Sequence, residues 1–166
     1  MRRFEHLGIE TTTVDHQAVF TVAESSELKQ AIPGGHTKNL FLKDKKGSLF
    51  LVVALCDAEI DLKKIHTRIG AQGRVSFGKA DLLMEVLGVT PGSVTPFSLI
   101  NDTDARVTTV LDAAMMTYDV LNYHPLLNNA TTSIKREDLQ TFIRDCGHEA
   151  NIVAVSNQAL ETDDQA

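Results

Sequence analysis

Hydrophobic and polar positions alternate along the chain in short stretches that predict a mixture of strands and helices. The clearest pattern is a pair of apolar stretches, 39–43 and 49–54, which flank a polar turn at 44–47 and predict a β-hairpin. Apolar side chains at helical spacing predict helices at 61–69 and 81–87. The other expected elements are strands at 9–14, 18–22, 74–77, 106–111, 130–134 and 152–155, a short helix that begins at Ser25, and a helix from Arg136 to Arg144. Because strands and helices mix without strict alternation, the pattern predicts an α+β fold: one domain with a mixed, mainly antiparallel, partly barrel-like sheet flanked by helices.

The length of 166 residues and the 43% hydrophobic content suit one well-buried core. We expect a single domain over 1–156 and a disordered tail over 157–166, where polar and acidic residues gather. No apolar run approaches the roughly 20 residues that span a bilayer, and no signal peptide is evident at the start. A cytoplasmic protein without membrane contact is therefore the expectation.

The net charge of −6 argues at first against a nucleic-acid partner. The charges are unevenly distributed, however. Residues 36–80 hold nine basic and four acidic side chains, a local balance of +5, and the remainder is strongly acidic. Such a polarised molecule can present a basic face to a polyanion, although solvated lysines alone would give the same composition.

Familiar catalytic and cofactor signatures are missing from the sequence. Cys56 and Cys146 lie far apart, and the six histidines form none of the close pairs that build a helical zinc site. There is no nucleophile elbow, no phosphate-binding loop and no dinucleotide fingerprint. We therefore expect neither a metal nor an organic cofactor.

Three polar stretches beside rigid loops are the candidate functional segments. In the first, 33–42, glycines allow close backbone approach, and Lys38 and Asn39 stand at the entrance to a strand. The second is 92–96, and the third, 122–132, contains His124. Taken one at a time, each is explained more simply as a turn, since Gly, Pro and Asn populate turns anyway.

Taken together and in order, the stretches resemble the YbaK/ProX superfamily, the trans-editing proteins related to the insertion domain of prolyl-tRNA synthetase. The matching segments are Ala18–Val22, Gly35–Asp44, Gly92–Phe97, Asn122–Leu126, Ala130–Thr132 and Gly147–Glu149. The form Lys-Asn-Leu-Phe-Leu at 38–42 looks more like members that clear alanine from proline tRNA than like the cysteine-clearing branch. Two departures are the short stretch before Leu7, where relatives have a longer helix, and the lack of paired prolines near 15–18.

The resemblance implies hydrolysis of a mischarged aminoacyl-tRNA ester, most specifically Ala-tRNA(Pro), by a free-standing proofreading factor. The implied partner is the acceptor end of mischarged tRNA, with either prolyl-tRNA synthetase or an elongation factor beside it. The resemblance implies a catalytic role for Lys38, which would hold the terminal phosphate or ribose. His124 is the second catalytic candidate, as general base or as a substrate-orienting group, and a structural histidine is the alternative reading of that residue. The implied substrate-binding residues are Asn39, Gly35, Gly92, Ser93, Val94, Thr95, Pro96 and Thr131. Backbone N–H groups of 92–96 would bind the ester carbonyl or the α-amino group.

Two alternatives stay open at this point. Hydrolysis can be directed at cysteine or serine esters of tRNA instead, because the pocket wall is assembled from residues distant in sequence. A non-catalytic module that binds the tRNA acceptor end would have the same fold.

Overall fold

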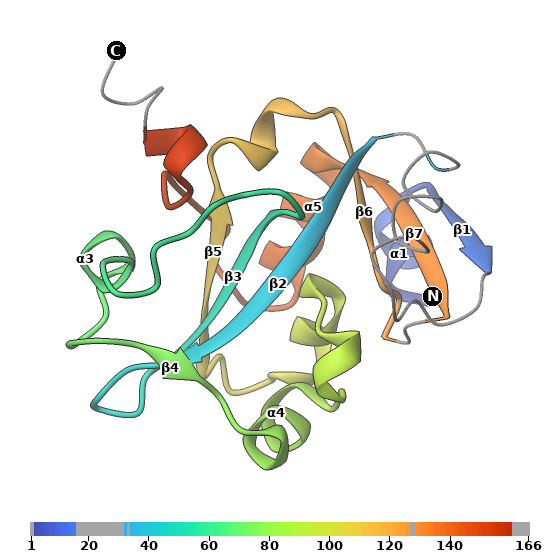
Figure 1. The fold of residues 1–166 in the computed structure, drawn as a ribbon. Coiled ribbons are helices and arrows are strands. Elements are labelled where there is room, and N and C mark those ends of the chain that lie inside the picture. Colours follow the sequence, from blue (N-terminus) through green and yellow to red (C-terminus); the bar gives the residue numbers. More distant parts are fainter. Residues whose placement is uncertain (1, 16–31, 33, 127–128, 161–166) are drawn as a thin grey trace.

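A mixed β-sheet forms the centre of the molecule (Figure 1). The computed structural model describes residues 2–15, 32, 34–126 and 129–160. Within these ranges the sheet has eight strands in the order β1-β7-β6-β2-β3-β5-β8, and β4 pairs with β2. The strands are β1 (Thr11–Asp15), β2 (Gly35–Lys43), β3 (Leu49–Leu55), β4 (Ser76–Phe77), β5 (Val107–Asp112), β6 (Val120–Tyr123), β7 (Ala130–Lys135) and β8 (Asn151–Val153).

Helices lie between the strands and pack on the sheet. The α-helices are α1 (Arg2–Leu7), α3 (His66–Ile69), α4 (Ala80–Leu87) and α5 (Arg136–Asp145), and the 3-10 helices are η1 (Pro91–Ser93), η2 (Pro96–Asn101) and η3 (Met115–Thr117). No helix in the described ranges is long and apolar enough to cross a membrane.

The strand pairings confirm the predicted fold class. β1–β7, β6–β7, β2–β3 and β2–β4 are antiparallel, whereas β2–β6, β3–β5 and β5–β8 are parallel. The described strands form an open sheet with β1 at one end and β8 at the other. The result is a mixed, mostly antiparallel sheet with helices, as the pattern of residues predicted.

The predicted hairpin is confirmed and is held at its turn by Asp44. The carboxylate of Asp44 accepts hydrogen bonds from the backbone N–H groups of Lys46, Ser48 and Gln72, at 3.0, 2.8 and 2.9 Å. These bonds lower the pKa of Asp44 below its ordinary value, the bond from Gln72 contributing most. β2 also extends four residues further toward the N-terminus than predicted, because Gly35 and His36 pair with β6.

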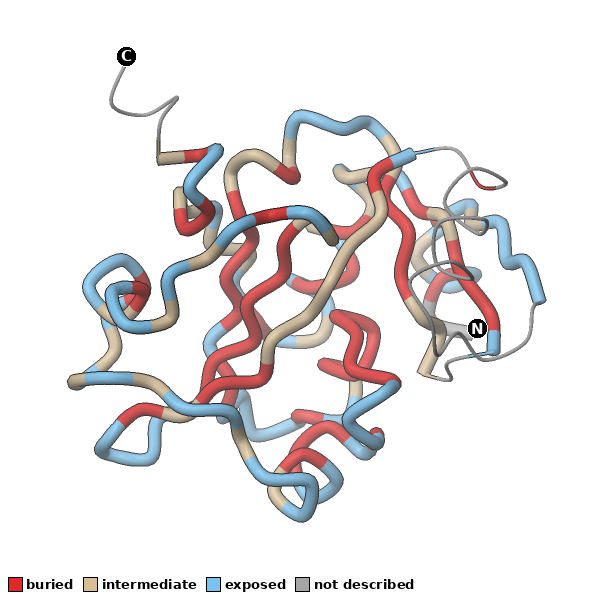
Figure 2. The backbone as a smooth tube through the Cα atoms, in the orientation of Figure 1, coloured by how far each residue is buried: buried red, intermediate tan, exposed pale blue. Residues whose placement is uncertain are grey.

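The two faces of the sheet bury two separate hydrophobic clusters. The face that we call the α4–α5 face carries Phe41, Leu51, Leu111 and Leu121, and it packs against α1, α4, η2 and α5. The opposite face, which we call the α3 face, carries Leu42, Phe50, Val52 and Val110, against Ile65 and Ile69. Successive residues of a strand point to opposite faces, so odd positions of β2 belong to the first face and even positions to the second. Figure 2 shows the central strands as the most buried part of the molecule.

Several expected elements differ from the structure. Of the helix expected over 61–69, α3 covers only His66–Ile69. Asp61 caps the turn before it, with its carboxylate accepting from the N–H of Lys63 and its carbonyl from Lys64 and Ile65. The strand at 18–22 and the helix from Ser25 lie outside the described residues. α1 and β6 were not predicted. α1 forms in the stretch before Leu7, and its Phe4 packs on Phe97 and Phe142 at ring-centroid distances of 5.1 Å each.

Residues 157–160, the start of the expected tail, have regular structure. These residues form a helical turn in which the N–H of Leu160 donates to the carbonyl of Ser156. Ala159 is buried there, and the N–H of Asn157 donates to the carbonyl of Glu59 at 2.7 Å. Tertiary hydrogen bonds therefore order a polar segment that composition alone marked as a tail.

Candidate functional site

Lys38 lies in the middle of β2, on the α3 face. Its strand neighbours Leu40 and Leu42 belong to the apolar cluster of that face, and its register partner on β3 is the small residue Ala54. The half-buried ammonium group donates a hydrogen bond to the carbonyl of Ala58, with Nζ and O 2.5 Å apart. An ammonium has three donors, so this bond fixes its direction and leaves donors for a substrate.

Asn39 points to the opposite face. It alternates with Lys38 in a regular ladder, where its partner is Val53, and it shares the α4–α5 face with Phe41. Its Oδ1 is buried and has no hydrogen-bond partner within the described part of the chain. In a regular strand the sheet stands between the side chains of Lys38 and Asn39, so the two face different surroundings.

His124 directly follows β6 and is bound to the start of β7. Its Nδ1 lies 3.3 Å from the carbonyl oxygen of Ala130, which only accepts, so Nδ1 carries the proton in this contact. β6 runs parallel to β2, with His36 opposite Asn122. Lys38 on β2 and His124 directly after β6 thus belong to two strands that are neighbours in the sheet.

Asn122 holds β2, β6 and β7 together beside this region. It is buried, its Nδ2 donates to the carbonyl of Gly35 at 3.2 Å, and its Oδ1 accepts from the hydroxyl of Ser133 at 2.5 Å. The hydroxyl of Thr37 donates to the backbone carbonyl of Asn122 at 2.6 Å. Asn122 belongs to the Asn-Tyr-His-Pro stretch, and it was not among the predicted site residues because its partners are distant in sequence. Thr131, a predicted binding residue, is also buried here, on β7 next to Ala130.

Side chains pack closely around Gly35. A Cβ at this position would lie 3.1 Å from side-chain atoms of Leu121 and Tyr118 and 3.2 Å from Leu55. This packing gives the glycine a structural reason, and its role in substrate binding stays a prediction. Gly34 has a φ of 104°, in the left-handed region, so the pair of glycines forms the bend that leads into β2.

The loop Gly92–Pro96 lies on the α4–α5 face and is largely internal. Ser93, Val94, Thr95 and Pro96 are buried and only Gly92 is exposed. The N–H of Ser93 already donates to the carbonyl of Thr90 at 2.9 Å, so it is committed to the turn. Phe97 anchors the end of the loop by packing on Tyr123 at a centroid distance of 5.7 Å. The structure therefore places this loop on the side of Asn39, away from the side chain of Lys38.

Most of the basic residues of 36–80 are exposed, and five of them lie in the hairpin turn and around α3. Lys45 and Lys46 lie in the turn, and Lys63, Lys64 and Arg68 lie in and before α3, on the face of Lys38. Asp57, Glu59 and Asp61 lie in the same connection and offset part of this charge. Within the described ranges, no three His, Cys, Asp or Glu side chains gather in a way that would hold a metal ion.

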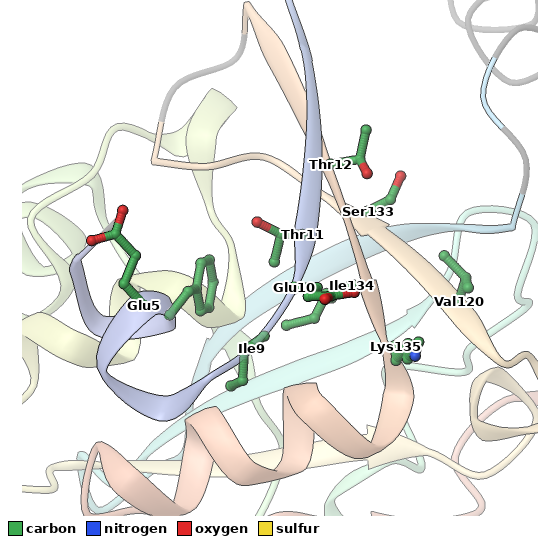
Figure 3. Close-up of a pocket in the computed structure, with 10 residues that line it drawn as sticks. Glu5, Ile9, Glu10, Thr11, Thr12, Val120, Ser133, Ile134 and Lys135 are labelled. Atoms are coloured by element: carbon green, nitrogen blue, oxygen red, sulfur yellow. The ribbon is translucent and has the colours of Figure 1, made fainter.

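A cavity of about 620 Å³ opens elsewhere, along β1 and the ends of β6 and β7 (Figure 3). It is lined by Phe4, Glu5, Ile9, Glu10, Thr11, Thr12, Val120, Ser133, Ile134 and Lys135. None of the predicted site residues lines it. Ser133, which lines this cavity, donates a hydrogen bond to Asn122.

Comparison with known proteins identifies the class to which this fold and site belong. Residues 16–142 match the family described as aminoacyl-tRNA editing domain. This match covers more than half of the chain and contains Lys38, the loop 92–96 and His124. The chain therefore belongs to the family of aminoacyl-tRNA editing domains, and the resemblance to the YbaK/ProX superfamily is confirmed.

Its relatives belong to the proline branch of that family. The chain is 37% identical over 156 residues to Prolyl-tRNA synthetase associated domain-containing protein 1 of Bos taurus, covering 92% of this chain and 91% of that protein. It is 35% identical over 147 residues to the Prolyl-tRNA editing protein ProX of Acetoanaerobium sticklandii, covering 88% and 89% of the two chains. Prolyl-tRNA editing is thus the family background of this protein.

Solved structures of other proteins share this fold. The crystal structure of a proposed trans-editing enzyme for prolyl tRNA synthetase superimposes with a TM-score of 0.71 at 19% identity, covering 94% of this chain and 96% of that one. A second crystal structure, of the hypothetical protein APE2540, gives a TM-score of 0.73 at 20% identity, with 94% and 97% coverage. At these identities the comparison shows the fold alone.

Proposed function

We propose that this protein hydrolyses the ester bond of mischarged Ala-tRNA(Pro), as a free-standing proofreading enzyme. The observation that carries the proposal is the placement of Lys38 on β2, where its ammonium group donates to the carbonyl of Ala58 and is held in one direction. An oriented cation can bind the terminal phosphate or ribose of the acceptor end and position the ester. The sequence similarity to a prolyl-tRNA editing protein supports the choice of proline tRNA.

Alanine is an amino acid that a proline-specific synthetase is expected to attach to proline tRNA by mistake. A synthetase pocket built for proline rejects a smaller amino acid weakly, since each missing methylene is worth only about 1 to 3 kcal/mol. The ester is already activated, so its hydrolysis needs orientation, a placed water and donors for the developing oxyanion. Lys38 would supply orientation, and the imidazole of His124, directly after β6, is the candidate acid–base group. We assign assistance of the attacking water to the 2′-hydroxyl of the terminal adenosine, as the family resemblance implies.

A second candidate function is binding of the tRNA acceptor end without hydrolysis. The observation that favours it is the state of the loop Gly92–Pro96, which is mostly buried and has the N–H of Ser93 committed to Thr90. An oxyanion site needs free N–H donors aimed at the reacting carbonyl. Cysteine or serine esters are the alternative substrates if hydrolysis occurs.

A deacylation assay tests the proposal. Purified protein is incubated with proline tRNA charged with alanine, cysteine, serine or proline, and the release of each amino acid is followed. We expect alanine to be released fastest. In Lys38→Ala we expect kcat/KM to fall about 100-fold or more, the scale of losing one positioned electrostatic group. His124→Ala in the same assay measures whether the histidine contributes to kcat.

The matched control for Lys38 is Lys79→Ala, which removes an exposed lysine whose side chain makes no capping hydrogen bond on α4. Its rate should equal that of the unmodified protein. If no ester is lost faster than in buffer while the protein still binds charged tRNA, the binding function replaces the enzymatic one. Faster release of cysteine or serine than of alanine would instead change the substrate.

A further inference from the structure

The carbonyl group that accepts a hydrogen bond from Lys38 belongs to a turn. The C-terminal segment forms hydrogen bonds to this turn, and we call these contacts the clamp. The turn is 57–59, directly after β3, and the segment is 155–160. The amide of Gln158 contacts the turn on both sides of Ala58, accepting from the N–H of Glu59 at 3.2 Å and donating to the carbonyl of Asp57 at 3.3 Å. Gln158 thus brackets the one residue whose carbonyl accepts from Lys38.

Asn157 adds a second set of bonds between the same two segments. Its backbone N–H donates to the carbonyl of Glu59 at 2.7 Å, and its Nδ2 donates to the carboxylate of Glu59 at 3.4 Å. The turn also has a bond of its own, from the N–H of Ala58 to the carbonyl of Leu55. Ala58 itself is buried, although Asp57, Glu59 and Gln158 are exposed.

Asp112 fixes the other end of the clamp to the sheet. Its Oδ1 accepts from the N–H groups of Val155 and Ser156, both at 3.0 Å, and the residue is fully buried at the end of β5. β5 is parallel to β3, so Asp112 is level with Ala54, the residue opposite Lys38 on β2. The segment that contacts the turn is therefore anchored to the same layer of the sheet that carries Lys38.

We propose that Gln158 is a positioning residue for Lys38: by holding Asp57 and Glu59, it fixes the Ala58 carbonyl that directs the ammonium group. This inference rests on the proposed function, in which Lys38 positions the tRNA end. A lysine side chain has four rotatable bonds, and its ammonium is directed only as well as the group that receives its hydrogen bond. Displacement of an orienting group by about 1 Å can cost up to 100-fold in rate.

The experiment compares Gln158→Ala with Gln72→Ala, which removes another exposed glutamine, one whose backbone N–H and not its side chain binds Asp44. Both proteins are checked for folding by thermal unfolding. Brief acetylation followed by peptide mass spectrometry then gives the rate at which Lys38 is modified, relative to exposed Lys79 in the same molecule. We expect the relative rate for Lys38 to rise about threefold or more in Gln158→Ala and to stay unchanged in Gln72→Ala, because the released ammonium exchanges its carbonyl partner for solvent.

Deacylation kinetics supply the second measurement. We expect kcat/KM in Gln158→Ala to fall about 10-fold, and to be unchanged in Gln72→Ala. An unchanged relative acetylation rate of Lys38 in Gln158→Ala overturns the inference, and so does an altered rate with normal kcat/KM. If the unmodified protein deacylates no tRNA, the proposed function fails, and the acetylation rate alone decides whether Gln158 orients Lys38.

Discussion

At the scale of single residues, neighbours in the sequence have separate tasks in the structure. Lys38 and Asn39 are adjacent, yet one side chain contacts Ala58 on the α3 face and the other enters the α4–α5 face. The buried Oδ1 of Asn39 has no partner among the described residues, and such an atom is costly unless a ligand or water completes it. Asp44 shows the opposite case, because its carboxylate accepts from backbone N–H groups of its own turn and from that of Gln72.

Asp44 gives a pH prediction. Its pKa is lowered in the folded protein, chiefly by the N–H of Gln72, so the folded state binds a proton there less readily than the unfolded chain. The stabilisation is therefore present above the ordinary carboxyl pKa of 3.8 and is lost as the pH falls below it. We expect Asp44→Asn to lower the melting temperature at pH 7, and the difference from the unmodified protein to shrink as the pH approaches 3. Thermal unfolding followed by circular dichroism at several pH values measures this. A difference independent of pH would mean that charge has no part in holding the turn.

At the scale of elements, the hairpin β2–β3 organises everything near Lys38. Its register is fixed over seven residue pairs, from Thr37 opposite Leu55 to Lys43 opposite Leu49. β4 and the segment before α4 approach it closely, and the N–H of Gly78 donates to the carbonyl of Phe41 at 2.9 Å. This contact needs a glycine because the ring of Phe41 occupies the space beside it.

Gly78→Ala tests that close approach. The added Cβ would lie 2.3 Å from Cε2 of Phe41, whose ring is buried and cannot swing into solvent. We expect a loss of about 1 to 3 kcal/mol in the free energy of unfolding, the usual cost of overpacking. Urea denaturation measures it, and Ser76→Ala on the exposed face of β4 is the matched control. Equal stability of the two variants would show that the strand pair yields without cost.

At the scale of the whole molecule, one face of the sheet holds most of the hydrophobic core, and the other carries the candidate catalytic residue Lys38. The α4–α5 face carries the larger apolar cluster, in which Phe97 contacts Phe4, Tyr123 and Phe142 at centroid distances of 5.1, 5.7 and 5.6 Å. The α3 face carries Lys38, the clamp formed by the C-terminal segment, and the exposed basic residues around α3. Lys63, Lys64 and Arg68 are the candidate basic contacts for tRNA on this face, beside the acidic Asp57, Glu59 and Asp61.

The exposed basic residues in and before α3 lead to a prediction for tRNA binding. Reversal of charge by Lys63→Glu and Lys64→Glu together should weaken binding of proline tRNA about 10-fold at low salt and reduce the dependence of affinity on salt concentration, since fewer counterions are released. Filter binding across a series of KCl concentrations measures both quantities. Lys135→Glu, an exposed lysine at the far edge of the sheet, is the control and should leave the salt dependence unchanged. Equal effects of the two changes would remove the α3 side as the tRNA surface.

Elements whose information is local were predicted well. The hairpin depends on the turn at 44–47 and on flanking apolar residues, and α4 depends on leucines at helical spacing, so each can be read from a short window. β6 was missed because it is only four residues long and is defined by pairing with β2 and β7, far away in the sequence. The helical turn at 157–160 was missed for the same reason, since its partners are Glu59 and Asp57.

The sequence by itself determined the family, the fold class and the stretches that bear polar groups, because motifs, periodicity and turn residues are encoded locally. Only the tertiary structure decided how those stretches combine. It placed Lys38 and Asn39 on opposite faces, filled the space beside Gly35 with Leu121 and Tyr118, and brought the C-terminal segment against the turn that holds Lys38. The physical reason is that strand alternation fixes the direction of a side chain only relative to its own sheet. What it meets on that face depends on strand pairings and on segments more than 80 residues apart, such as Thr37 with Asn122 and Glu59 with Gln158.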